Sequence, residues 1–219
     1  MSKQLDRVVG TEQLCGLDEA GRGPLAGPLV AAAVIFPPDF VFAEVFPALK
    51  FGDSKQLSAH QREAALSHIH EFALAIEVQI VSVDDINEQG IGWANRAAFE
   101  RLIVALDADR YVVDGNLKLA NLGKKARRVE SMVRADQSIQ SVSAASIVAK
   151  VTRDRIMREL HTDFPVYGWD HNAGYCTREH LAAVRTHGST LHHRRQFVTT
   201  ALSKSVPHLP GISEEESSR

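Results

Sequence analysis

Two apolar segments, 14–18 and 29–36, flank a turn rich in glycine and proline at 21–28, and this pattern limits the fold most strongly. The longest nearly apolar run, 25–36, has 12 residues and includes a glycine and a proline. A helix that crosses a bilayer needs about 20 apolar residues, so this run is too short to be one. Both segments favour strands, and a turn of this composition commonly joins two strands. The sequence therefore predicts a pair of strands near the N-terminus.

The rest of the chain alternates strand and helix patterns. Ser58 followed by Gln61 is a capping-box signature, which predicts a helix through about Phe72. Residues 164–174 are rich in aromatic residues, glycine and proline, as in a linker or a binding loop. Further strands are predicted over 75–83, 110–113 and 130–133, and further helices from Asp85 or Gly92 to about 106, from Ser143 to about 160, from Thr177 to Gly188 and over 191–202. This order predicts an α/β fold with a sheet domain over 1–160, a C-terminal helical extension over 161–210 and a disordered tail over 211–219.

Composition narrows the class of protein. Of the 219 residues, 44% are hydrophobic and 24% are charged, which is typical of a globular domain. Cys15 and Cys176 are too few for a disulfide framework or a four-cysteine zinc site. The first 13 residues carry four charged side chains and no apolar core, so we expect a cytoplasmic protein with no signal peptide and no membrane partner.

Positive charge is concentrated in one stretch. Residues 118–158 contain ten Lys and Arg against three Asp and Glu, a net of +7, whereas the whole chain has a net charge of −2. A basic stretch of this kind is typical of phosphate contacts, and it is as often a solvated face balanced by acids elsewhere. Charge alone leaves both interpretations open.

Four carboxylates lie at or just beyond the ends of predicted apolar strands. Asp18 and Glu19 end the first strand, Asp114 ends the strand Tyr-Val-Val-Asp, and Asp136 follows a third. Acids at these strand ends would meet at one edge of the sheet and repel one another unless a cation lies among them. Oxygen ligands suit Mg²⁺ or Mn²⁺, and two such ions about 4 Å apart can activate a water and stabilise the leaving oxygen of a phosphodiester.

Each of these features has a plainer interpretation. An Asp before Gly, as at Asp114, is commonly a turn residue. Neighbours on a regular strand face opposite sides, so Asp18 and Glu19 serve one site only if the backbone deviates, which the glycines at 21 and 23 would permit. We expect Asp154 to pair with cations of its own helix.

The sequence matches the motifs of other enzyme classes poorly. The segment 21–26 loosely matches a dinucleotide-binding fingerprint, but that fingerprint must open a helix and here it precedes a predicted strand. The sequence contains no P-loop and no Gly-x-Ser-x-Gly nucleophile elbow. His192 and His193 are adjacent, which is not the spacing of two zinc ligands on one helix face.

Five segments resemble, in order, the motifs of the bacterial ribonuclease HII family. They are Cys-Gly-Leu-Asp-Glu-Ala-Gly-Arg-Gly-Pro from Cys15, Asp-Ser-Lys-Gln-Leu-Ser from Asp53, Tyr-Val-Val-Asp-Gly-Asn from Tyr111, the segment 136–154, and the segment 167–180. The resemblance implies an RNase H-like mixed β-sheet flanked by helices. It also implies a metal-dependent endoribonuclease that cleaves RNA in RNA–DNA hybrids and cuts 5′ of single ribonucleotides in duplex DNA, leaving 3′-hydroxyl and 5′-phosphate ends.

The resemblance assigns roles to particular residues. The catalytic and metal-binding set would be Asp18, Glu19, Asp114 and Asp136, holding two Mg²⁺ or Mn²⁺ ions. The substrate-binding set would be Gly21, Arg22 and Gly23, whose backbone senses the ribose 2′-hydroxyl, Tyr175, which contacts the same group and stacks on the next sugar, and Lys55, which binds a phosphate of the DNA strand. The 2′-hydroxyl is what distinguishes RNA from DNA, and glycine lets the backbone approach it closely. The plainer alternatives are a packed loop aromatic for Tyr175 and a solvated surface side chain for Lys55.

The sequence departs from the family pattern at three places. The family usually has a lysine where this sequence has Asn172-Ala173, and it commonly has Lys-Gly where this sequence has Arg134-Ala135. Near the C-terminus the family more often has Gly-Pro-x-x-His-Arg, whereas here His193-Arg194 follow Gly-Ser-Thr-Leu-His. We expect the partners to be RNA–DNA hybrids and ribonucleotide-containing duplex DNA, bound by a monomer that removes misincorporated ribonucleotides and RNA primers. The alternatives are a catalytically silent hybrid-binding protein of the same fold and, less favoured, a cofactor-binding oxidoreductase built on the glycine turn.

Overall fold

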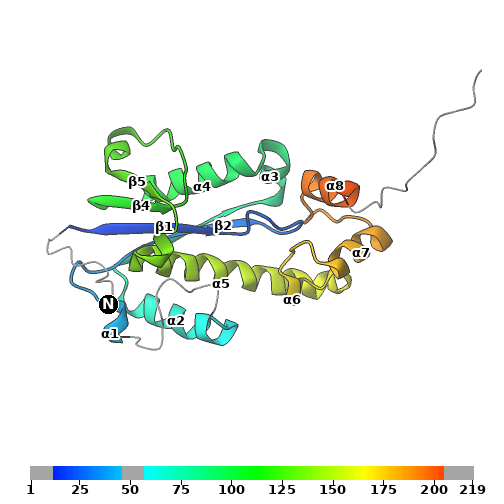
Figure 1. Ribbon diagram of the computed structural model, residues 1–219, viewed down its shortest axis with the longest axis horizontal. Helices are drawn as coiled ribbons and strands as arrows, with labels where there is room; N and C mark the ends of the chain where they lie inside the picture. The colour runs from blue at the N-terminus through cyan, green and yellow to red at the C-terminus, as the bar shows by residue number, and fades with distance from the viewer. Residues whose placement is uncertain (1–11, 46–56, 205–219) are drawn as a thin grey trace, which may run out of the picture.

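The computed structural model describes residues 12–45 and 57–204 and contains a five-stranded mixed sheet (Figure 1). Its strands are β1 (Leu14–Ala20), β2 (Leu29–Ile35), β3 (Ala75–Val81), β4 (Arg110–Asp114) and β5 (Val129–Met132), in the spatial order β3-β2-β1-β4-β5. β2 pairs antiparallel with β1 and β3, whereas β4 runs parallel to β1 and β5. The predicted strand pair and the predicted α/β fold with a mixed sheet are confirmed.

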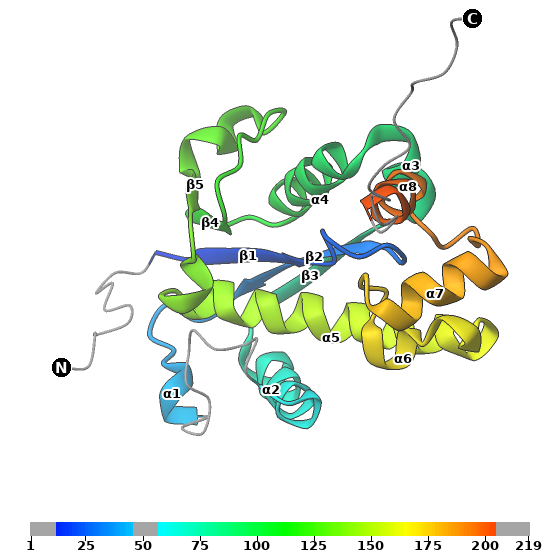
Figure 2. The same cartoon turned by 45° about the vertical axis from the view of Figure 1, so that its right-hand side comes forward.

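Helices cover both faces of the sheet. The α-helices are α1 (Phe42–Val45), α2 (Ala59–Phe72), α3 (Val83–Gln89), α4 (Ile91–Ala105), α5 (Gln140–Asp163), α6 (Trp169–Asn172), α7 (Arg178–His187) and α8 (Arg195–Lys204), and the short 3-10 helices are η1 (Gly123–Arg128), η2 (Ala135–Gln137) and η3 (Pro165–Tyr167). Figure 1 shows α3 and α4 on one face and α5 with α2 on the other, while α6, α7 and α8 gather at the end where the β1–β2 turn lies (Figure 2). No helix in the described ranges is long and apolar enough to cross a membrane.

The alternation of side chains along the strands divides the core between the two faces. Leu17 and Ala31 pack in one cluster with Phe99 of α4, and Val30 packs in the other with Ile147 of α5. Both clusters are needed because side chains on successive strand residues point to opposite faces. β2 is buried along its whole length, which explains its unbroken apolar sequence.

Helix α5 runs under the middle of the sheet and extends to the C-terminal helices (Figure 2). It begins at Gln140, three residues earlier than the predicted Ser143. Its first turn passes very close to β1, since a Cβ placed on Gly16 would lie 2.2 Å from the Val142 nitrogen. The glycine at this position therefore permits the close packing that brings α5 beneath the end of β1.

Local capping accounts for several helix ends. Ser58 accepts from the Gln61 N–H and Gln61 accepts from the Ser58 N–H, so the predicted capping box is present. Thr177 caps α7, and Gly188 follows its last residue with a φ of +79°. The predicted helix start at Asp85 or Gly92 was too simple, because Gly90 at a φ of +83° separates two helices, α3 and α4.

In the C-terminal third, one of two alternatives for a loop and the start of one helix were wrong. The segment 164–174 is not a linker: it contains η3 and α6, and Tyr167 and Trp169 are buried in a third apolar cluster with Leu25 of the β1–β2 turn. The helix predicted over 191–202 begins only at Arg195. The residues before it run alongside the β1–β2 turn instead, where the Arg194 N–H donates to the Leu25 carbonyl at 2.7 Å.

Candidate active site

The parallel pairing of β1 and β4 brings two of the predicted carboxylates to the same place. The last paired residues are Leu17 and Val113, so Asp18 and Asp114 follow side by side at the ends of this pairing. Asp18 is only 7% exposed, and its Oδ1 accepts the Glu19 N–H at 2.7 Å. Ser146 of α5 also hydrogen-bonds to the Asp18 carboxyl.

The electrostatics of Asp18 show that negative charge accumulates here. Burial, followed by the negative charge of Glu19, raises the pKa of Asp18 to about 8, and Asp114 contributes in the same direction. The hydrogen bond from Ser146 and that from the Glu19 backbone lower it only in part. Glu19 and Asp114 thus both lie within electrostatic range of Asp18, and no cation of the described residues lowers its pKa.

Asp136 is joined to this group through the backbone. The Asp114 carboxylate accepts the Ala135 N–H at 2.8 Å, so Asp114 holds the short helix η2 and is not simply a turn residue before Gly115. Asp136 is the next residue and is 6% exposed. A left-handed backbone at Arg134, with a φ of +61°, makes the sharp turn from β5 into η2.

Glu19 approaches from the other side of β1. The pairing of β1 with β2 stays regular through Ala20, and the left-handed turn comes only at Gly21, with a φ of +94°. The expectation that the two acids could serve one site only through a backbone deviation was therefore wrong, because Glu19 adds to the effect of burial in raising the pKa of Asp18 without one. Pairing with β4 has already ended at Leu17, which leaves this flank of β1 uncovered. Glu19 Oε1 lies 3.4 Å from Arg22 Nη1.

A cleft of about 350 Å³ connects Glu19 with the predicted substrate-binding residues. Its walls include the backbone of Gly21, Arg22 and Gly23, together with Tyr175 and Ser146. Tyr175 is 44% exposed, so the alternative of a packed loop aromatic is wrong. The Arg153 guanidinium lies 5.9 Å from the centre of the Tyr175 ring, within the range of a cation–π contact.

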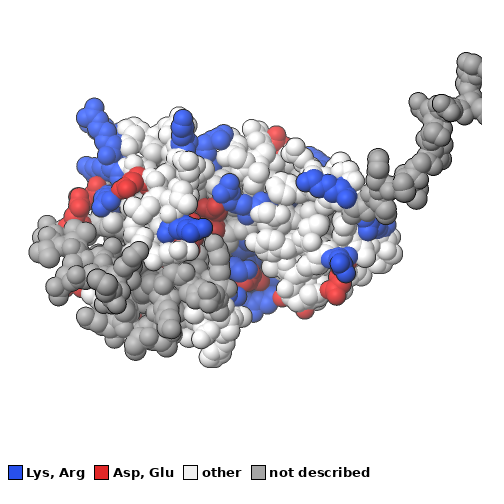
Figure 3. Space-filling view, in the orientation of Figure 1, with Lys and Arg blue, Asp and Glu red and all other residues white. Residues whose placement is uncertain are grey.

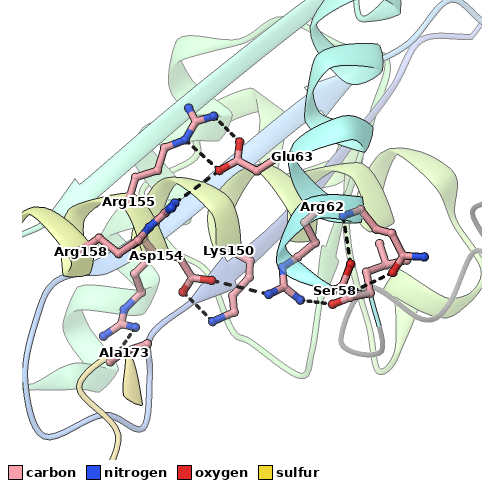
Figure 4. Close-up of polar contacts among 11 residues, drawn as sticks. Ser58, Arg62, Glu63, Lys150, Asp154, Arg155, Arg158 and Ala173 are labelled. Atoms are coloured by element: carbon pink, nitrogen blue, oxygen red, sulfur yellow. Dashed lines mark hydrogen bonds and ion pairs between the residues drawn. The ribbon is translucent and has the colours of Figure 1, made fainter. Parts of the chain in front are cut away.

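Two cations on the cleft wall had no assigned role from the sequence. Arg62 of α2 and Lys150 of α5 both point toward Asp154 (Figure 4), at 3.8 Å and 2.7 Å. The predicted pairing of Asp154 with its own helix is therefore confirmed, and α2 adds a second cation. No sequence pattern singled out Arg62, which is remote from α5 in the chain, whereas Lys150 lies within the fourth motif.

The basic stretch over 118–158 does not form one continuous surface. Lys125 donates to three carbonyls at the C-terminal end of α4, and Arg153 is buried. Arg155 and Arg158 both pair with Glu63 of α2 (Figure 4). On the face in Figure 3, Lys and Arg form several separate groups with Asp and Glu between them. The charge excess of the sequence therefore divides between helix capping, buried contacts and the cleft.

Comparison with known proteins decides the family. The family model described as Ribonuclease HII matches residues 15–200. The chain belongs to the ribonuclease HII family. Its enzyme class is accordingly that of a type HII ribonuclease H endonuclease.

Individual relatives support the same assignment. Ribonuclease HII of Burkholderia mallei (strain SAVP1) is 46% identical over 195 residues, covering 88% of this chain and 86% of the relative. The crystal structure of ribonuclease H2 from Pyrococcus horikoshii OT3 is similar with a TM-score of 0.70 and 26% identity, covering 88% of this chain and 98% of that one. The structure of Bst-RNase HIII in complex with Mn²⁺ has a TM-score of 0.64 at 20% identity, covering 90% of this chain and 71% of that one, and this likeness shows the fold alone.

The chemistry of the carboxylates suits a hard divalent cation. They supply only oxygen donors, and the raised pKa of Asp18, caused first by burial and then by Glu19, marks a charge that a cation would stabilise. Within 12–45 and 57–204, however, no three His, Cys, Asp or Glu side chains are grouped closely enough to hold a metal ion. Carboxylates that repel one another stay apart without a cation, so metal binding would have to draw these side chains together.

Two ribonuclease HII motif positions lie outside the carboxylate set. Asn172, in the motif that usually carries a lysine, donates to the Tyr167 carbonyl at 2.7 Å and accepts the Gly174 N–H at 2.8 Å, so it shapes the turn before Tyr175. Lys55 lies outside the described residues, and its predicted contact with a DNA phosphate stays a prediction.

Proposed function

We propose that this ribonuclease HII cleaves RNA in RNA–DNA hybrids and cuts on the 5′ side of single ribonucleotides embedded in duplex DNA, leaving 3′-hydroxyl and 5′-phosphate ends. One observation carries the proposal. A single cleft is lined by Glu19 of β1, by residues 21–23 and by Tyr175, and Glu19 lies close enough to Asp18 to add to the effect of burial in raising its pKa. A phosphate beside the carboxylates and a ribose beside the glycines can therefore belong to the same nucleotide step.

We assign hydrolysis to Asp18, Glu19, Asp114 and Asp136, of which Glu19 lines the cleft. Two Mg²⁺ or Mn²⁺ ions bound there would stabilise charge on the phosphate and lower the pKa of a water. Asp18 must be ionised to hold a cation, and its pKa of about 8, raised first by burial, means that cation binding and loss of its proton are coupled. The hydrogen bond between Ser146 and Asp18 keeps the carboxyl group oriented toward α5.

We assign recognition of the ribonucleotide to residues 21–23 and Tyr175, which line the same cleft. Gly23 has space beside it, since a Cβ there would meet only Tyr175 Cε1, at 3.9 Å. A ribose can therefore approach the backbone of Gly23, and backbone N–H and C=O groups are the kind of partner that a 2′-hydroxyl needs. Tyr175 can stack on the neighbouring sugar with its exposed ring.

Cations and the helical extension would hold the rest of the duplex. Arg62 and Lys150 line the cleft and can each turn from Asp154 to a phosphate. We assign the extension over 161–210 and Lys55 to binding of the duplex, and the biological role to removal of misincorporated ribonucleotides and RNA primers by a cytoplasmic monomer.

The test is to map the cut in three duplexes in Mg²⁺ and in Mn²⁺: DNA with one ribonucleotide, an RNA–DNA hybrid, and DNA alone. We expect a nick 5′ of the single ribonucleotide, cleavage throughout the hybrid, and no cleavage of DNA or by Asp114→Asn. Cleavage of the hybrid alone would remove the role given to 21–23 and Tyr175. Binding without cleavage in either metal would favour a catalytically silent hybrid-binding protein.

A further inference from the structure

A buried arginine outside the carboxylate set holds the turn between β1 and β2, residues 21–28, here called the recognition loop. Arg194 has no exposed surface. Each hydrogen bond that its side chain makes to a described residue goes to a carbonyl of the recognition loop. Burial lowers the pKa of Arg194 to about 9, and no carboxylate in the described ranges forms an ion pair with it. Its other described contact is with the Phe197 ring, 5.5 Å from the guanidinium carbon to the ring centre. Burying a charge without a carboxylate partner is costly, which suggests that Arg194 has a specific role.

The contacts of Arg194 join the two ends of the recognition loop. Its Nη2 donates to the Gly21 carbonyl at 2.6 Å and to the Gly27 carbonyl at 2.8 Å. Its Nη1 donates to the Arg22 carbonyl at 3.1 Å, and its Nε to Gly27 at 2.9 Å. Gly21 and Arg22 are two of the three residues whose backbone would meet the ribose, and Arg194, which does not line the cleft, holds both by their carbonyls.

These contacts fix the direction of the peptide N–H groups. In a trans peptide the C=O and the following N–H point in opposite directions, and no peptide in the described ranges is cis. The Gly21 and Arg22 carbonyls point to Arg194, which is buried and does not line the cleft. The N–H groups of Arg22 and Gly23 consequently point away from Arg194, and neither donates to another residue that the structure describes. Two donors without a described partner therefore point away from Arg194, and both belong to residues that line the cleft.

The residue next to Arg194 reaches the other recognition element. His193 Nε2 lies 3.2 Å from His180 Nε2, and His180 Nδ1 lies 2.9 Å from the Tyr175 carbonyl. Trp169 Nε1 donates to His180 Nε2 at 3.1 Å, which makes Nδ1 the nitrogen that donates to Tyr175. The pair His193-Arg194 thus contacts the recognition loop directly and the Tyr175 backbone through one histidine.

We propose that Arg194 is a positioning residue for ribonucleotide recognition, which holds the Gly21 and Arg22 carbonyls so that the Arg22 and Gly23 N–H groups face the 2′-hydroxyl. The inference depends on the proposed function, because it explains how that function selects a ribonucleotide. The guanidinium is suited to the task since its donors lie in a fixed plane and reach three carbonyls at once. A lysine keeps the charge and can donate to several carbonyls, as Lys125 does, but its donors share one nitrogen and cannot reproduce the planar spacing of Nε, Nη1 and Nη2.

The informative variant is Arg194→Lys. Arg194→Ala would leave three buried carbonyls without a donor and could simply unfold the protein. Lys125 supplies a matched control because it also donates to three carbonyls, those of Ile103, Val104 and Leu106, at the far end of α4. Lys125→Met should lower the stability of the fold without touching the recognition loop.

The experiment measures binding without cleavage, in buffer with a chelator. Fluorescence anisotropy gives the Kd of each variant for two duplexes that are identical except for one 2′-hydroxyl, at 15 °C. We expect the wild type to bind the ribonucleotide duplex at least about tenfold more tightly, which is about 1.4 kcal/mol. In Arg194→Lys this ratio should approach 1 while the Kd for the DNA duplex changes by less than about twofold. Lys125→Met should keep the wild-type ratio.

Each other outcome counts against the proposal. A wild-type ratio in folded Arg194→Lys would mean that Arg194 does not position the recognition loop. An equal loss of affinity for both duplexes, or failure of Arg194→Lys to fold at 15 °C, would assign Arg194 to general stability. Equal binding of both duplexes by the wild type would contradict the 2′-hydroxyl reading in the proposed function, and the role of Arg194 with it.

Discussion

The raised pKa of Asp18 should make the free energy of unfolding of the metal-free protein depend on pH. Burial, then the charge of Glu19, raises this pKa from 3.8 to about 8, so between these pH values the folded protein binds a proton that the unfolded chain releases. Stability should therefore fall as the pH rises through this window. At about 1.4 kcal/mol per pH unit the shift corresponds to at most about 6 kcal/mol, and because Glu19 and Asp114 share the charge we expect about 2–3 kcal/mol. Asp18→Asn should remove most of this loss.

Urea unfolding with a chelator, at half-unit steps from pH 5 to pH 8.5, measures the effect. The free energy of unfolding of the wild type should decline with pH, while that of Asp18→Asn should be flatter and higher at pH 8. Adding Mg²⁺ or Mn²⁺ at pH 8 should stabilise the wild type more than the variant, since binding to the folded state adds to its stability. Parallel pH profiles for the two proteins would refute the assignment of this charge to Asp18.

Three further predictions concern the recognition loop and its surroundings. Gly21→Ala should lower the midpoint of thermal unfolding markedly, because the φ of Gly21 is +94° and the new Cβ would lie 2.1 Å from Arg153 Nε. Gly23→Ala should unfold at nearly the wild-type temperature, yet it should cleave a single-ribonucleotide duplex at least about tenfold more slowly. An equal loss of stability in the two variants would contradict the separate roles of Gly21 and Gly23. Burial lowers the pKa of His193 from 6.5 to about 4, so the unfolded chain binds the extra proton in this window and stability should be lost as pH falls from about 6.5 to 4; His193→Asn should flatten that limb in urea unfolding. Lys150→Ala should weaken duplex binding equally with and without a ribonucleotide and reduce the slope of log Kd against log salt by about 1, and an unchanged slope would exclude a phosphate contact.

The sequence predicted the parts of the fold that depend on local patterns. The apolar strands around the turn at 21–28, the capping box at Ser58 and the Thr177 cap depend on neighbouring residues, and the structure has all of them. The linker alternative for 164–174 was wrong because its aromatic residues pack in a cluster with Leu25, which is remote in sequence. The start of α8 was misjudged because Arg194 is held by the recognition loop and not by a helix.

The residues of the candidate site also differ in whether the sequence could predict them. The motifs identified the carboxylates and the glycines, since strand ends and left-handed turns leave a signature in the sequence. The contributions of Arg62 and Arg194 have no such signature, because each depends on a partner on a distant segment: Asp154 for Arg62 and the Gly21 carbonyl for Arg194. A buried arginine without a carboxylate partner becomes evident only from its contacts.

Whether cleavage and ribonucleotide recognition share one site is tested with two duplexes that differ in one 2′-hydroxyl, under single-turnover conditions with Mn²⁺ and the protein in excess. If the carboxylates, the recognition loop and Tyr175 form one site, the ribonucleotide duplex should be cut at least about 10³-fold faster, at the phosphate 5′ of the ribonucleotide. Cleavage of both duplexes at similar rates, or a cut elsewhere in the strand, would contradict the account.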